Sequence, residues 1–205
     1  QHMAREVVYG PSGYGGLSIR HLYDEQGIKI VQQFLKHWRS IGTPSALLKA
    51  TFSWIQFQAG TGTSILNDNG KHLPHLESLW IKEIRQYLIS IGGSIELDDP
   101  MIPPLQRQHD SYIMDTVLET TNVFTPKEIQ VINYCRLFLQ AVTVSDLSLP
   151  DGISIDQSFL TGDPSLMSST TAHTRVRQDK PGPIAWRAWR KACKLMADKH
   201  GTLYN

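Results

Sequence analysis

The stretch Tyr14–Arg39, YGGLSIRHLYDEQGIKIVQQFLKHWR, is the part of the chain from which the fold is best predicted. It begins with Gly15 and Gly16, where backbone angles closed to other residues are available. The glycines lack the spacing of a P-loop or a dinucleotide fingerprint, so a hinge is favoured over a phosphate site. Apolar residues then recur at the spacing of one helical face, at Val31, Phe34, Leu35 and Trp38. We therefore expect a hinge followed by a core helix.

Similar periodic stretches predict further helices along the chain. Thr125 and Glu128, with Pro126 between them, form a capping box that marks a helix start. The longest apolar periodicity runs over 76–91 and is expected to form the central helix. Turn residues at 67–70 suit a hairpin, and 94–97 reads as one short strand. The expected helices lie near residues 21–39, 43–59, 76–91, 109–120, 126–142 and 183–199.

These patterns predict a mainly α fold, an irregular bundle of about six helices with long loops and at most a minor hairpin or short strands. We expect four consecutive parts. They are a segment at 1–20 that continues an upstream domain, a helical core at 21–142, a polar loop region at 143–181 and a basic C-terminal helix at 182–205.

The composition is that of a folded intracellular chain. Of its 205 residues, 40% are hydrophobic and 19% are charged, enough to build a core and too apolar for general disorder. No apolar run approaches the roughly 20 residues that a membrane helix needs. The polar start at 1–5 carries no signal-peptide pattern. Cys135 and Cys193 lie in helical patterns and are expected to be buried apolar residues rather than a disulfide framework.

Charge is unevenly distributed along the chain. Residues 1–92 carry nine basic and six acidic side chains, residues 93–174 three basic and eleven acidic, and residues 175–205 eight basic and two acidic. The net charges of these parts are therefore +3, −8 and +6. A basic end after an acidic middle indicates either a polyanionic partner for the end or packing of the two segments on each other.

The last predicted helix carries a candidate nucleic-acid-binding surface. Cations recur at i, i+3, i+4 and i+7 along it, at Arg187, Arg190, Lys191 and Lys194. Arg175 and Arg177 precede the helix. Such a stripe suits a phosphate backbone, because each neutralised phosphate releases counterions. The alternatives are a simply solvated face and a helix that docks on the acidic segment 93–174. Trp186 either stacks on a base or lies in the core.

Motifs for catalysis and metal binding are weak. Asp98 and Asp99 are the one adjacent aspartate pair, but Pro100 follows them and a solvated turn is the simpler interpretation. His72 and His75 are three residues apart with no further ligand at zinc spacing, so we interpret them as surface or capping residues. A hydrolase relay at 109–111, His-Asp-Ser, is the least favoured alternative.

Several phrases of the chain resemble the region downstream of the polymerase domain in non-LTR retrotransposon open reading frames, of the type abundant in some algal genomes. The first phrase comprises Gly15, Gly16, Leu17 and Ile19, followed by Trp38 and Arg39; Ser18 stands where the family phrase usually has glycine. The other matching phrases are LPHLESLWI at 73–81, IPPLQRQHD at 102–110, INYCRLFLQAVTVSDLS at 132–148 and WRAWRKA at 186–192.

This resemblance implies a non-catalytic C-terminal segment of a reverse transcriptase, an RNA-directed DNA polymerase whose active site and Mg²⁺ lie upstream. The implied partners are RNA or DNA and the upstream polymerase domain. The resemblance thus assigns the enzyme activity to the parent polypeptide, while no catalytic motif is expected in this chain. The alternative function is a helical protein–protein interaction module with an exposed apolar face around Phe52, Phe57 and Tyr87.

Overall fold

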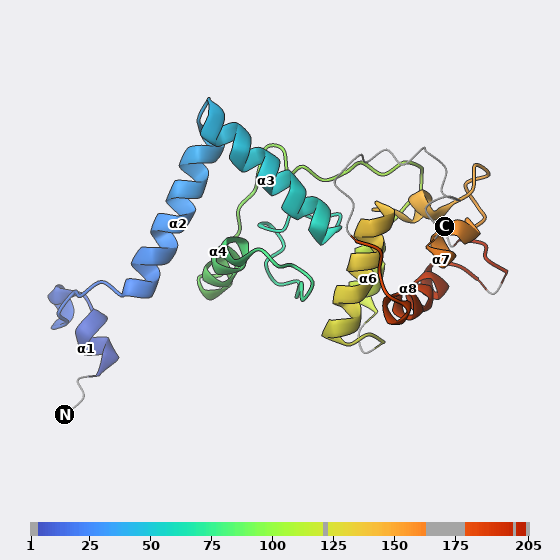
Figure 1. Ribbon diagram of the computed structural model, residues 1–205. Helices are drawn as coiled ribbons and strands as arrows, with labels where there is room; N and C mark the ends of the chain where they lie inside the picture. The colour runs from blue at the N-terminus through green and yellow to red at the C-terminus, as the bar shows by residue number, and fades with distance from the viewer. Residues whose placement is uncertain (1–3, 121–122, 163–178, 199, 204–205) are drawn as a thin grey trace. The chain divides into compact units, whose positions relative to one another are not determined.

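The computed structural model describes residues 4–120, 123–162, 179–198 and 200–203, and these residues are mainly helical (Figure 1). Within these ranges the chain forms eight α-helices and two 3₁₀ turns, and its β-structure consists of isolated bridges. The expected mainly α class is confirmed. The chain divides into two compact units, the first made of 1–50 and 79–93 and the second of 51–78 and 94–205.

The first unit is organised by one long helix. Helix α2 spans Leu22–Arg39, within a residue of the expected 21–39. It packs against α4, which spans Leu79–Ser90. The smaller elements of this unit are α1 (Arg5–Tyr9), the 3₁₀ turn η1 (Ser12–Tyr14) and the first residues of α3 (Thr43–Ala59).

Aromatic side chains fill the contact between α2 and α4. Phe34 and Trp38, two members of the predicted apolar stripe, are buried, and their rings stack with centroids 5.6 Å apart. The Phe34 ring also lies 6.2 Å from that of Trp80 on α4. At Gly27 the helices approach so closely that an added Cβ would lie 2.1 Å from the Tyr87 ring. The apolar face predicted for α2 is therefore the face that packs against α4.

The second unit contains the larger apolar core. Its helices are the remainder of α3, α5 (Ile113–Glu119), α6 (Pro126–Leu139), α7 (Gln157–Thr161) and α8 (Pro183–Met196), with the 3₁₀ turn η2 at Val144–Leu147. Helices α6 and α8 lie side by side, and α5 and α7 both pack on α8 (Figure 1). Cys135 of α6 and Cys193 of α8 are buried free thiols, as expected. Burial raises the pKa of each to about 12, so both thiols stay neutral and apolar.

The centre of the fold differs from the sequence-based expectation. The helix predicted over 76–91 was expected to be central, but the largest core cluster forms around α6 and α8. Trp189 of α8 and Ile132 of α6 are fully buried in this cluster. The 76–91 helix instead begins at Leu79, since 73–78 is non-helical with a turn at 74–75, and it belongs to the first unit. A regular apolar period shows that a helix has a buried face, but it does not show which helix lies at the centre of the core.

Several expected local features also differ. The region 143–181 was interpreted as loop, yet within its described part it contains η2 and α7. Residues 94–97 form no strand; the Ile95 amide donates a single hydrogen bond to the Leu66 carbonyl. The predicted hairpin at 67–70 is a turn without paired strands. The compact units also cut across the predicted 21–142 core, since α4 groups with α2 while 51–78 groups with the C-terminal helices.

In the part of the chain that the structure describes, none of the helices combines the length and the hydropathy that crossing a bilayer requires.

Candidate nucleic-acid interface

Helix α8 carries the candidate interface, and its start and orientation follow from its sequence. Pro183 occupies the first helical turn, where its missing N–H is no loss. The apolar side turns into the core of the second unit, with Ala185, Trp186, Ala188, Trp189, Ala192, Cys193 and Met196 buried. The opposite side is therefore held outward on a helix that the core fixes in place.

The two tryptophans of α8 are core residues. The indole N–H of Trp186 donates to the Pro181 carbonyl at 2.9 Å, and that of Trp189 to the Phe159 carbonyl at 2.9 Å. Trp186 is 6% exposed and its ring lies edge-on to Phe138. Of the two expectations for Trp186, base stacking and the core, the structure favours the core.

The four predicted cations of α8, Arg187, Arg190, Lys191 and Lys194, are all exposed. They come from one side of the helix, as the i, i+3, i+4 and i+7 spacing requires. The preceding Arg175 and Arg177 lie outside the described residues. The structure therefore brings four of the six predicted site residues to one helical surface.

Lys191 differs from its three neighbours because it is engaged within the chain. Its ammonium donates to the Val123 carbonyl at 2.7 Å and lies 4.7 Å from the centroid of the Phe124 ring. It also forms an ion pair with Glu128, with the nitrogen and oxygen 3.6 Å apart. The Thr125 backbone and hydroxyl, and then Lys191, lower the pKa of Glu128, which keeps that carboxylate ionised. This contact is the packing on the acidic middle segment that was one sequence-based alternative.

Arg187, Arg190 and Lys194 form what we call the free basic face. Among the described residues, none of the three makes a hydrogen bond or an ion pair. With a rise of about 1.5 Å per residue, the seven-residue step from Arg187 to Lys194 spans roughly 10 Å. Three unpaired cations over that length suit an extended polyanion better than a single small anion.

The alternative sites considered from the sequence do not assemble. The Asp99 carboxylate accepts the Met101 N–H at 3.0 Å, as in a turn. Across the described ranges no cluster of three histidine, cysteine or acidic side chains is placed to hold a metal ion.

The histidine candidates are structural or isolated. A ring nitrogen of His75 lies 2.9 Å from the carbonyl of Ala59, the last residue of α3, while His72 is exposed. Burial lowers the pKa of His75 to about 4, so it is neutral at physiological pH. The Asp110 carboxylate is occupied by backbone N–H groups, among them that of Ser145 at 3.0 Å, and not by the exposed His109. The expected capping role of His75 fits this contact.

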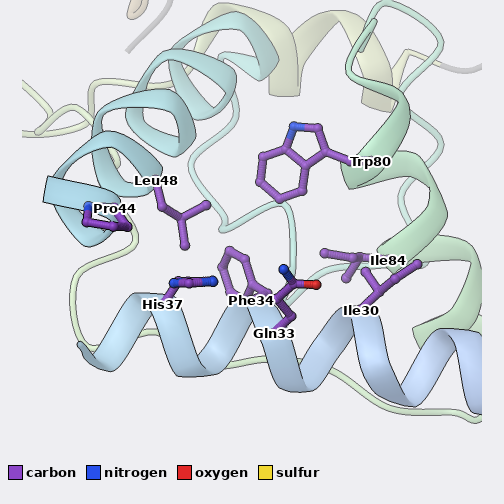
Figure 2. Close-up of a pocket in the computed structure, with 8 residues that line it drawn as sticks. All are labelled: Ile30, Gln33, Phe34, His37, Pro44, Leu48, Trp80 and Ile84. Atoms are coloured by element: carbon purple, nitrogen blue, oxygen red, sulfur yellow. The ribbon is translucent and has the colours of Figure 1, made fainter.

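The apolar face proposed for protein binding is buried. Phe52, Phe57 and Tyr87 are 0%, 1% and 7% exposed. Apolar surface lies elsewhere, because a hollow of about 300 Å³ opens between α2, α3 and α4 in the first unit (Figure 2). Figure 2 shows Phe34 and Trp80 on its walls, with His37 beside Phe34.

A second hollow, of about 460 Å³, is lined by Arg107 in the second unit. Nε and Nη2 of Arg107 have no hydrogen-bond partner among the described residues. The carboxylates of Asp146 and Asp156 line the same hollow and oppose an anionic ligand. The free basic face presents three exposed cations on one helix, so its charge suits a polyanion better than that of the Arg107 hollow does.

No protein-family model, no curated protein and no solved structure matches this chain.

Proposed function

We propose that this chain is the C-terminal, post-catalytic segment of a retrotransposon reverse transcriptase and that the free basic face of α8 contacts the backbone of RNA or DNA. The phrases from Gly15 to Ala192 that resemble the post-polymerase region of such elements support the origin. The upstream polymerase domain, with its own Mg²⁺, is then the partner that supplies chemistry.

The main support for a nucleic-acid contact is a set of exposed cations, unpaired among the described residues, on a helix whose opposite side is buried in the core. Arg187, Arg190 and Lys194 are exposed, while the opposite side of α8 is locked into the core. Little side-chain packing has to be disrupted when phosphates approach. Lys191 contributes less, because part of its charge is already compensated by Glu128.

The test is binding to structured RNA and to duplex DNA over a salt series. If three cations each neutralise one phosphate, the slope of log K against log salt concentration is about −2.7 on a duplex. The triple variant R187E, R190E and K194E is expected to lose binding at low salt. A matched control, K29E, K36E and R39E on α2, changes the net charge equally at three exposed positions.

Loss of binding in the α8 variant with retention in the α2 variant supports the proposal. Equal loss in both variants would mean that net charge alone drives binding. Absence of binding by the folded wild-type chain at low salt would exclude the nucleic-acid role.

The competing function is a helical protein-interaction module, and the apolar surface of the first unit favours it. Leu22, Leu47 and Leu79 are 85%, 62% and 74% exposed. This function predicts self-association or protein capture that is insensitive to salt and to charge reversal on α8. Sedimentation at low and high salt separates it from the nucleic-acid contact.

A further inference from the structure

A hollow of about 270 Å³ lies at the C-terminal end of α8 and continues the free basic face. Arg190 and Lys194 line it, so two of the three unpaired cations border a cavity rather than a flat surface. The sequence pattern showed the cations but not the cavity, because most of the other lining residues come from 155–160, where α7 begins, and from the residues that follow α8.

The turn that closes the hollow is held by hydrogen bonds. The Asp198 carboxylate accepts the N–H of His200 at 2.7 Å and that of Thr202 at 2.9 Å. These bonds lower the pKa of Asp198, and the bond from the Thr202 N–H has the largest effect. An isolated bridge between Ala197 and Leu203 further fixes the turn. His200, which also lines the hollow, is thereby positioned next to the cations.

The hollow is positive on one side and apolar on the other. Arg190 and Lys194 supply two positive charges, and Asp198, the one carboxylate among the lining residues, is ionised and accepts two backbone N–H groups, so the lining keeps an excess of positive charge. Ile155, which is 5% exposed, and Leu160 provide apolar wall. A ligand that fits both sides must join an anion to a flat or apolar group.

We propose that this hollow receives one nucleotide of a single-stranded RNA or DNA, with its phosphate on Arg190 and Lys194 and its base against Leu160. This inference rests on the proposed nucleic-acid contact and specifies its substrate as single-stranded. A single strand can turn one base out of its stack into a cavity, whereas a duplex keeps its bases paired inside. At about 270 Å³ the hollow lies just below the range of small-molecule sites, so it admits at most one such unit.

The decisive variant is Leu160→Ala, which removes the apolar wall without changing charge. Leu160 is half-buried, so the variant is first checked by thermal melting. Binding of a short unstructured oligonucleotide is expected to weaken about fivefold to tenfold, at the low end of the effect of losing an aromatic stacking platform, because leucine offers an apolar contact without a ring. Binding of a duplex hairpin of equal phosphate number should change less than about twofold, with the salt slope of both ligands preserved.

A second variant covers the case in which Leu160→Ala is poorly folded. Gln157→Glu is isosteric, places a carboxylate on the hollow, and lies in the first turn of α7, where a negative charge is favourable. It is expected to weaken oligonucleotide binding about tenfold, and duplex binding less. Leu195→Ala on α8 is the control, since Leu195 is equally half-buried and lies outside the lining of the hollow.

The outcomes separate this inference from the proposed function. Equal weakening of single strand and duplex, or no effect of either variant on the single strand, overturns the nucleotide pocket while the backbone contact stands. Selective loss of single-strand binding in both variants supports the pocket. If the wild-type chain binds neither ligand at low salt, the pocket and the backbone contact are both refuted.

Discussion

Replacing Arg136 with methionine is expected to destabilise the second unit strongly. Arg136 on α6 is fully buried, and its guanidinium makes four hydrogen bonds at 2.6–3.0 Å. One goes to the Asn133 side chain, one to the Ala141 carbonyl, and two to the carbonyls of Phe57 and Gln58. The last two carbonyls belong to the final turn of α3, whose acceptors have no partner within the helix. Arg136 therefore joins α3 to α6 as a C-terminal cap.

The magnitude follows from the groups that lose their partner. Burial lowers the pKa of Arg136 to about 9, so the side chain still carries its charge at pH 7. Methionine occupies a similar volume but leaves four acceptors without their donor, three of them in buried bonds and the Gln58 carbonyl in a partly buried one. It also removes the desolvation penalty of the charge. Each buried acceptor left without a donor costs about 1–3 kcal/mol. Because removal of the buried charge offsets part of that sum, we expect a loss of about 3–5 kcal/mol, a large fraction of the roughly 5–15 kcal/mol of a native domain. Arg136→Lys keeps the charge but cannot span the same acceptors, and we expect a loss of about 2 kcal/mol.

Guanidinium chloride unfolding followed by tryptophan fluorescence measures these losses. Arg187→Met is the control, because Arg187 is exposed on α8 and its replacement should change stability by less than about 0.5 kcal/mol. A methionine variant at position 136 within about 1 kcal/mol of wild type would falsify the capping argument. A lysine variant as unstable as the methionine variant would show that hydrogen-bond geometry, and not charge, dominates.

Two further perturbations test the packing of each unit. His75 has its pKa lowered from 6.5 to about 4 by burial, so the unfolded chain binds the proton more readily. The stability that neutral His75 contributes is complete above pH 6.5 and is lost as the pH falls towards 4, by up to about 3 kcal/mol. Unfolding curves at several pH values measure this, and His75→Gln should flatten the dependence; an unchanged slope in that variant contradicts the assignment. In the first unit, Gly27→Ala places a Cβ 2.1 Å from the Tyr87 ring and should lower stability by about 1–3 kcal/mol in thermal melting. Gly13→Ala, with nothing within 4 Å of the added Cβ, is the control, and equal melting temperatures for the two variants would argue against close packing of α2 on α4.

Local signals in the sequence were sufficient to predict the main helices. Helix α2 begins and ends within a residue of its periodic pattern, and α6 begins with the predicted capping box, in which Thr125 and Glu128 bond reciprocally. The end of α6 was placed too late, because Gln140 adopts a left-handed conformation with φ of 57° that the apolar run through Val142 does not reveal. Helix α7 was missed altogether, since its five residues carry too short a pattern to register.

Exposure was harder to predict than helical structure. The alternative function, a protein-interaction module, placed Phe52 and Phe57 on an exposed face, but both lie inside, with the Arg136 guanidinium 5.4 Å from the Phe57 ring centroid. The partner that covers Phe57 is 79 residues away in the chain. A pattern within one helix cannot say which other segment will cover its wider faces.

Residue spacing is enough to predict a mainly helical chain with cations along one face of its last helix, because helix geometry places residues of that spacing on one face. Which of those cations is already engaged depends on contacts between distant segments. Lys191 contacts Val123 and Glu128, whereas Arg190 and Lys194 border the hollow that Leu160 of α7, Asp198 and Gly201 also line. Ion pairs and cavities form between segments that are distant in the chain, and those segments come together because they bury a shared apolar core.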